Sequence, residues 1–432
     1  MLKGIINAFK VKELRGKILL TVGLLLLYRL GSYVPVPGIP FNELQSQYTA
    51  MGQIMGMPAF AVLNMFSGGA LSRVSVFSLG IMPYITAQII FQMMQAVIPS
   101  LEQLAKEGEA GQRKITQYTR YLALGLSLLN AIGYLFLFQS ETFGGGINFA
   151  ASGLPVPLMS VLVVGTMLTG SMLIMWFGEI ITQRGVGNGM SLIIFCNIMS
   201  GIPSAIISEV TGSTNGAIVT AITLAVCIAI IPLIVFVERG QRRIPIQYAK
   251  RVVGRRVMGG QTTYLPIKVN TAGVVAIIFA SSILYFPAQI AVFFPNVAWI
   301  NAVANNISQG WMNWVLSVAL IVFFSYFYTS MVFNPEDTAD NLRKSGGFIP
   351  GVRPGAPTAA YIKNVLDKVT LPGAIFVAVL AVVPSIIFTF TNNSLVQTFG
   401  GTSILIMVGT ALDTLSQLES QLKMYDYEGI FK

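Results

Sequence analysis

Ten apolar stretches, each long enough to cross a bilayer, constrain the fold of this 432-residue chain more than any other feature. A membrane-spanning helix needs about 20 apolar residues, and runs of that length recur between polar breaks. Because 54% of the residues are hydrophobic and only 10% are charged, we expect a polytopic membrane protein rather than a soluble globule. The expected spans are residues 18–34, 74–97, 118–138, 158–177, 187–207, 216–237, 272–294, 312–333, 371–391 and 400–418.

The distribution of positive charge predicts the orientation of these spans. Cytoplasmic loops of membrane proteins are enriched in Lys and Arg. All 27 Lys and Arg residues except Arg29 and Arg73 fall in the N-terminal arm (1–17), the C-terminal tail (419–432) or alternate loops and their margins. We therefore expect both termini in the cytoplasm, with the first span acting as the targeting signal and no cleaved leader.

One apolar segment is left over after the spans are assigned. Phe60 to Leu71 offers only about three helical turns before Gly68 and Gly69, which occupy a helix-stop position. It is too short to cross a bilayer, and it lies beside a second span interrupted by Pro83. Irregular backbone at membrane depth is tolerated only inside protein or against water. We therefore expect the chain to enclose a pore that holds this segment.

The number of spans indicates how the chain is divided. Five spans fall in an N-terminal half (18–207) and five in a C-terminal half (208–418), so the halves have opposite orientations. An internal repeat would have to be of the inverted kind, although the two halves share no visible sequence similarity. The expected fold is all-α, with ten transmembrane helices in two inverted five-helix halves around a central pore and a short re-entrant plug helix.

Two long cytoplasmic loops have the sequence patterns of ordered structure. In residues 238–270, apolar positions alternate around Ile244 and Ile246 and again around Leu265 and Ile267, which predicts a two-stranded hairpin. In residues 334–370, Asn334-Pro335 is a helix start, and a Pro/Gly-rich turn precedes a helix that leads into the ninth span.

The residues that most chemistry requires are scarce. There is no His, and Cys196 and Cys227 lie within spans, which argues against disulfide scaffolds, Cys/His zinc sites and His acid–base chemistry. The glycine-rich segment 185–189 lacks the Lys-Ser/Thr of a phosphate-binding loop and is typical of a tight turn. We expect no catalytic residue, metal or cofactor. An intramembrane enzyme would need a protease dyad or metal ligands, and neither is present.

A secondary transporter is the main rival class, because ten spans with inverted parity would also suit one. Such a protein needs ionisable or polar coordinating groups at mid-membrane. Here Arg29 is the main ionisable residue inside a span, and Glu179 and Asp413 lie near span ends. The sequence therefore argues against ion-coupled transport.

Aliphatic pairs could form the lining of the expected pore. Ile81 and Ile85 are four residues apart, as are Met190 and Ile194, so each pair lies on one helix face. Core packing alone would explain this spacing. If several spans converge on one axis, however, a ring of such side chains could form a hydrophobic constriction.

Five long motifs together resemble the SecY/Sec61-alpha family, whose bacterial members are the channel subunits of the Sec protein translocon. The resemblance covers essentially the whole chain, in order. The motifs lie at Phe66–Gln92, Arg184–Phe195, Val237–Asn270, Asn334–Gly355 and Phe399–Ile406.

The resemblance implies roles for individual residues of the channel. Residues 59–71 would form the plug, including Phe60, Leu63, Asn64, Phe66, Gly68 and Gly69. The pore ring would consist of Ile81, Ile85, Met190, Ile194, Ile278 and Ile406, in which methionine replaces the commoner isoleucine at position 190. A lateral gate between spans 2 and 7 would include Thr86, Gln92 and Phe286. Its two polar side chains can bond across helices when the gate is closed and contact a signal sequence when it is open.

The resemblance also implies function and partners. The expected function is translocation of unfolded preproteins across the bacterial plasma membrane and lateral release of signal sequences and membrane spans, with energy from SecA or the ribosome and no enzymatic activity of its own. The expected partners are SecE, SecG, SecA, the ribosome, preproteins with signal sequences, SecDF, YidC and anionic lipids. The expected docking residues for SecA or the ribosome are Arg242, Arg243, Arg255, Arg256 and Arg353.

Overall fold

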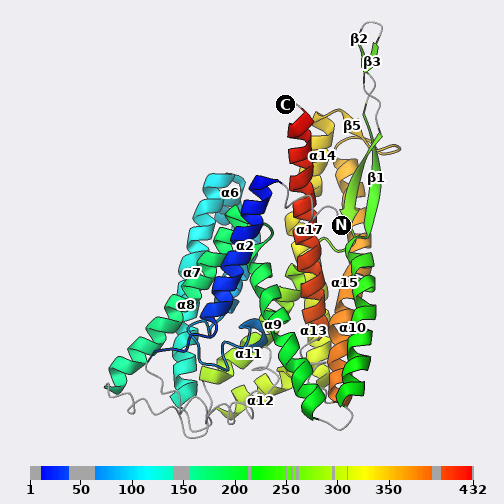
Figure 1. The fold of residues 1–432 in the computed structure, drawn as a ribbon. Coiled ribbons are helices and arrows are strands. Elements are labelled where there is room, and N and C mark those ends of the chain that lie inside the picture. The colour runs from blue at the N-terminus through cyan, green and yellow to red at the C-terminus, as the bar shows by residue number, and fades with distance from the viewer. Residues whose placement is uncertain are drawn as a thin grey trace.

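Each of the ten expected spans contains a helix in the computed structural model (Figure 1). The structure describes residues 11–37, 64–139, 155–212, 216–248, 251–253, 256–258, 262–293, 297–308, 310–391 and 400–430. By length and apolar composition alone, five helices in this part of the chain could each cross a membrane. The helices that correspond to the spans are α2 (Lys12–Gly31), α5 (Met82–Val97), α7 (Glu109–Gln139), α8 (Val156–Arg184), α9 (Gly189–Gly212), α10 (Gly216–Glu238), α11 (Val275–Phe293), α13 (Gly310–Val332), α15 (Ala356–Thr391) and α17 (Gly401–Ile430).

The helices form two groups that meet along a shared core. Helices α2, α7 and α8 lie on one side of the molecule, and α10, α13, α15 and α17 lie on the other (Figure 1). Helix α9 packs against α10 and α17, and α11 packs against α5 and α7, so contacts from both ends of the sequence join the groups. One buried hydrophobic cluster draws residues from both halves of the chain.

The second span differs from its expected form, because its helix begins only at Met82 rather than at residue 74. Residues 67–81 form turns, apart from a β-bridge between Ser75 and Pro35, and Gly80 has a positive φ of 58°. Pro83 therefore lies in the first turn of α5, where its missing N–H costs no hydrogen bond, and it does not interrupt a longer helix. This span is an irregular segment followed by a 16-residue helix.

In the part of the chain that the structure describes, the shorter helices α6 (Pro99–Lys106), α12 (Ala298–Ser308) and α14 (Pro335–Lys344) accompany the spans. The sequence predicted only α14, and its start is confirmed. The side chain of Asn334 accepts a hydrogen bond of 3.0 Å from the backbone N–H of Glu336, which caps the helix.

The two long loops form a single unit. Strands β1 (Gln241–Tyr248) and β4 (Thr262–Lys268) pair antiparallel with Ile244 opposite Leu265, which confirms the predicted hairpin. The sequence did not predict β5 (Gly347–Phe348), which comes from the other loop and pairs with the free edge of β1. Strands β2 (Arg251–Val253) and β3 (Arg256–Met258) form a separate small ladder at the far end of this projection (Figure 1). The shared core of the two loops contains Ile244, Ile246, Ile267, Leu342, Ile349, Ile362 and Leu366.

Candidate functional site: a central segment, a hydrophobic cluster and a helix seam

The segment that precedes α5 ends a helical turn at a pair of glycines. Asn64–Phe66 is helical, and the chain then turns through Gly68 and Gly69, whose φ angles are 67° and 81°. The N–H of Gly69 donates to the carbonyl of Asn64 at 2.8 Å, which satisfies a helix-end carbonyl. The predicted helix stop is thus confirmed. Phe60 and Leu63, which were predicted to belong to the plug, lie outside the described residues.

Three separate helices hold this segment by hydrogen bonds. A guanidinium nitrogen of Arg29, on α2, donates to the carbonyl of Gly68 at 2.7 Å. The amide of Asn197, on α9, donates to the carbonyl of Phe66. The hydroxyl of Ser403, on α17, lies 3.2 Å from the sulfur of Met65. The segment therefore contacts both halves of the molecule and forms part of their junction.

A cationic cluster surrounds the turn after the glycines. The guanidinium of Arg29 lies 5.0 Å from the ring centre of Tyr33, and that of Arg73 lies 4.1 Å from the same ring. Arg29 also donates to the hydroxyl of Tyr33 at 3.1 Å. Both arginines can interact favourably with the negative face of the ring. Sequence reasoning noted Arg29 only as an isolated charge within a span, and it missed Asn197 and Ser403, which carry no local sequence signal.

All six predicted ring residues lie in the hydrophobic cluster that joins the halves, and all are buried. Ile81 precedes α5, which carries Ile85, and the others come from α9, α11 and α17. Phe66 and Ala70 of the central segment belong to the same cluster. The full set of six is Ile81, Ile85, Met190, Ile194, Ile278 and Ile406. Four elements thus contribute aliphatic side chains to the buried cluster that also includes part of the short segment, an arrangement that excludes water.

Met190 lies close to a neighbouring helix. A Cβ atom built at Gly178 on α8 would lie 2.5 Å from the sulfur of Met190, so the glycine leaves room for the thioether. An unbranched, flexible side chain can fill this irregular space. Methionine at this position therefore matches a specific gap against α8.

The predicted gate residues lie on helices that contact each other, because α11 packs against α5, α7 and α13. The hydroxyl of Thr86 donates to the carbonyl of Met82, one turn earlier in α5, at 3.0 Å, and so bonds within its own helix in this structure. Because this hydroxyl bonds within α5, it does not link α5 to α11. Phe286, on α11, is half-exposed.

The side-chain oxygen of Gln92 is buried and has no hydrogen-bond partner among the described residues. It lines a pocket of about 260 Å³ between α5, α7 and the end of α13. Gln88 and Gln95 line the same pocket from α5, and Gln112 lines it from α7. The spacing of the α5 glutamines places them on one face, a signal that the sequence contained and that our reading did not use.

The predicted docking arginines lie on the projecting unit or its margins. Arg242 and Arg243 are exposed on β1, and Arg353 is exposed in the turn before α15. Arg256 belongs to β3, although its side chain is outside the described set, and Arg255 lies outside the described residues. Because β5 joins the two loops, Arg353 and the β1 arginines belong to one ordered surface.

Glu179 takes part in an ion pair. Arg120, on α7, donates from Nε to one carboxylate oxygen at 2.9 Å and from Nη2 to the other at 2.6 Å. This fork geometry fixes α7 against α8. A carboxylate held in this way has a structural role in joining the two helices.

Comparison with known proteins identifies the family. The SecY family profile matches residues 75–415. The chain is 44% identical over 439 residues to the protein translocase subunit SecY of Streptomyces coelicolor, and 45% identical over 444 residues to that of Mycobacterium bovis. Each alignment covers 100% of both chains.

Solved structures share the fold. A protein-conducting channel superposes with a TM-score of 0.60 at 18% identity, covering 93% of this chain and 91% of the other. A SecY structure described by its plug domain gives a TM-score of 0.58 at 17% identity, with the same coverage. Sec61 from a canine ribosome–channel complex gives 0.55 at 17% identity, also with that coverage. With a family profile that matches most of its length and relatives that align from end to end, this chain belongs to the SecY family of protein translocase subunits.

Proposed function

We propose that this chain is the pore-forming subunit of a protein-conducting channel, through which unfolded preproteins cross the membrane. The observation that carries the proposal is the single buried cluster that contains six aliphatic side chains from both halves together with Phe66 and Ala70 of the central segment. Aliphatic side chains can yield around a passing chain and close again without leaving a polar path for ions. Family membership supports the same function.

The central segment acts as the plug in this proposal. Its bonds to Arg29 and Asn197 are few and specific, so an incoming chain can displace it without unfolding a helix bundle. The two glycines at its end provide backbone freedom for that movement. Deleting residues 60–69 should leave the protein assembled and raise its resting ion conductance in planar bilayers. An unchanged conductance would argue against a plug.

The seam between α5 and α11 serves as the side exit toward lipid for signal sequences and membrane spans. Support for a seam that opens at low cost comes from the contact between these helices, from the Thr86 hydroxyl bonding within α5, and from the Gln92 side-chain oxygen having no partner among the described residues. To test this exit, the native Cys196 and Cys227 are first replaced so that they cannot react. Thr86→Cys and Phe286→Cys are then introduced, and the two new thiols are joined with a bifunctional maleimide.

The linked protein should lose signal-sequence release, because the two helices can no longer separate. The same variant treated with a monofunctional maleimide serves as the control and should remain active. Equal activity of the linked and unlinked samples would overturn the gate assignment.

The unit built from β1, β4, β5 and α14 is the docking surface for the partner that supplies energy, either SecA or the ribosome. Its support is the grouping of Arg242, Arg243 and Arg353 on one ordered surface, since guanidinium groups bind carboxylates and phosphates through paired donors. Arg353→Glu should reduce partner-driven translocation without affecting assembly. Arg113→Glu, which changes an exposed arginine elsewhere, is the matched control and should have no such effect.

The remaining assignments complete the proposal. The chain has no enzymatic role, lies in the bacterial plasma membrane with both termini in the cytoplasm, and works with SecE, SecG and, as accessory partners, SecDF and YidC. Co-purification of the full-length protein from its native membrane, followed by mass spectrometry, tests the partner set. Recovery of the chain without any small membrane subunit would contradict it.

A further inference from the structure

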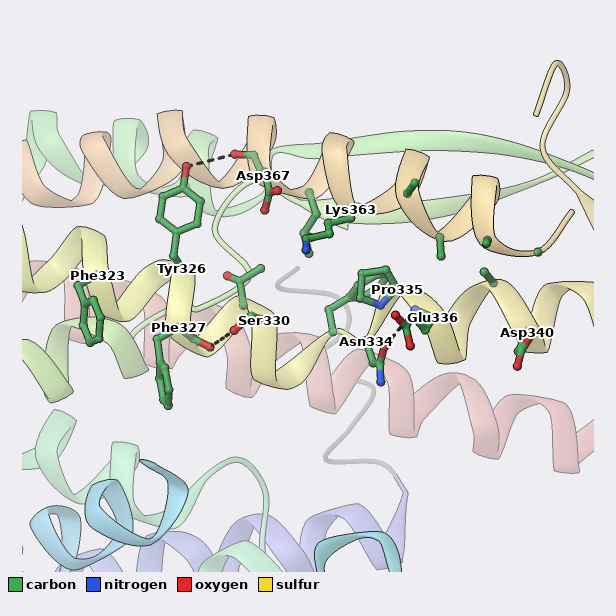
Figure 2. Close-up of a pocket in the computed structure, with 18 residues that line it drawn as sticks. Phe323, Tyr326, Phe327, Ser330, Asn334, Pro335, Glu336, Asp340, Lys363 and Asp367 are labelled. Carbon is green, nitrogen blue, oxygen red and sulfur yellow. Dashed lines mark hydrogen bonds between the residues drawn. The ribbon is translucent and has the colours of Figure 1, made fainter. Parts of the chain in front are cut away.

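An open groove lies between α13, α14 and α15, away from the central cluster. Its volume is about 980 Å³, which is at the upper end of the range for sites that bind small organic molecules. The walls come from the last turns of α13, the first turns of α14 and the first half of α15 (Figure 2). On the α15 side, Ala356, Ala359 and Ala360 have small side chains, and Gly355, just before the helix, has none, so this wall leaves the space open.

The lining of the groove changes in character along its length. Phe323 and Phe327 form its apolar end, Thr329 and Ser330 follow, and Asn334 begins the charged end. At 1.5 Å per residue, Phe323 and Asn334 are about 17 Å apart along the axis, close to half of the bilayer's hydrocarbon thickness of about 30 Å. Because α13 is a membrane span, this sequence of apolar, hydroxyl and charged groups follows the depth profile of one leaflet.

The charged end of the groove favours a ligand that carries a cationic group next to an anionic group. Glu336, Asp340 and Asp367 line it, and Lys363 is the cation among the described lining residues (Figure 2). Asp340 also lies 3.4 Å from Arg343 in a solvent-exposed ion pair, which contributes little and leaves its carboxylate accessible. The N-terminal ends of α14 and α15 open toward the same region, and their dipoles favour a phosphate. A headgroup that carries a primary ammonium and a phosphate matches both features, whereas a headgroup with net negative charge meets the excess carboxylates.

A buried polar group in the wall also lacks a partner. Thr329 is only 3% exposed, and its hydroxyl has no hydrogen-bond partner among the residues that the structure describes. A buried hydroxyl without a partner is costly. Its place between the aromatic and charged ends of the groove corresponds to the depth of lipid ester carbonyls, which can accept its hydrogen bond.

We propose that this groove binds one molecule of phosphatidylethanolamine. The acyl chains lie along Phe323 and Phe327, an ester carbonyl accepts from Thr329, and the ammonium group lies between Glu336 and Asp340. A soluble peptide fits the groove less well, because its aromatic end lies at the depth of the hydrocarbon core and Phe323 is 54% exposed there. The groove lies away from the central cluster and shares α14 with the proposed docking surface.

The test measures lipids retained by the full-length protein. The purified protein is exchanged into detergent that contains equal amounts of phosphatidylethanolamine, phosphatidylcholine and phosphatidylglycerol, and bound lipids are counted by native mass spectrometry. Wild type should retain phosphatidylethanolamine about fivefold or more over phosphatidylcholine, whose quaternary ammonium has no N–H to donate. Equal retention of the two, or preferential retention of phosphatidylglycerol, would overturn the proposal.

Variants locate the binding to this groove. The double variant Glu336→Gln and Asp340→Asn should abolish the preference, whereas Glu107→Gln with Glu109→Gln, at exposed carboxylates on another part of the chain, should keep it. Ala359→Trp should remove the retained lipid by filling the groove. Thr329→Val should lower retention without lowering the melting temperature, since the lost hydroxyl has no hydrogen-bond partner in the described part of the chain. Retention unchanged in all three groove variants, or a co-purifying polypeptide that Ala359→Trp displaces, would refute the lipid assignment.

Discussion

Replacing Asn197 with leucine should release the central segment from α9. The amide of Asn197 donates to the carbonyl of Phe66, and the two residues are 131 positions apart in the sequence. Asn197 is only 1% exposed, so water cannot readily take the place of its amide. Leucine has a similar size and no donor, and the variant therefore leaves the Phe66 carbonyl buried without this bond.

The cost of an unpaired buried carbonyl is about 1–3 kcal/mol. If the carbonyl regains a partner when the plug moves away, the variant destabilises only the closed state. The ratio of open to closed channels should then rise by about 5- to 150-fold. Arg29 and Ser403 still hold the segment, so the effect should stay below that of deleting the plug.

Single-channel recording in planar bilayers measures this ratio directly as the resting open probability. The control is Ser200→Ala, one turn further along α9, where the hydroxyl bonds only within its own helix. An open probability equal to that of wild type, in a protein with an unchanged melting temperature, would refute the reasoning that this bond holds the segment in place.

Three further predictions concern the frame around this site. Gly170→Ala should lower the free energy of unfolding by about 1–3 kcal/mol, because a Cβ there would overlap the backbone of the segment before α5. The control Gly165→Ala, with open space around it, should change the melting temperature little, and equal thermal shifts in the two variants would contradict the close approach at Gly170. Glu179→Gln should cost about 1–3 kcal/mol by weakening the paired bonds from Arg120, and an unaltered melting temperature would show that the pair contributes nothing. Asn334→Ala should destabilise the start of α14 by about 1 kcal/mol. Amide hydrogen exchange should become faster in the first turn of α14 but not in α17, and an unchanged exchange rate in α14 would mean that the cap is dispensable.

Features set by local sequence could be predicted. Apolar runs fix the helices because a backbone in lipid must satisfy its own hydrogen bonds, and length alone then decides which runs can span. The start of α14 at Asn334 and the pairing of β1 with β4 followed from a capping residue and from alternation around Ile244 and Ile246. Each of these signals lies within one element or one hairpin.

The start of α5 at Met82 could not be predicted in the same way. Residues 74–81 are apolar enough to continue a helix, but they instead pack against other parts of the chain. Val76 bonds to Val34 beyond the end of α2, and Gly170 of α8 lies against the backbone of Val76. Contacts with distant helices thus outweighed the local preference of an apolar run.

The sequence by itself determined the class of protein, the number of spanning helices, the stop at Gly68 and Gly69, and the aliphatic character of the pore candidates. Only the tertiary structure decided that Arg29, Asn197 and Ser403 would meet at one short segment, that Thr86 would bond within its own helix, and that β5 would join the two loops. The physical reason is that lipid acts on every residue through its hydrophobicity, which can be read locally. Hydrogen bonds between residues as far apart as Met65 and Ser403, 338 positions, depend on how whole helices pack.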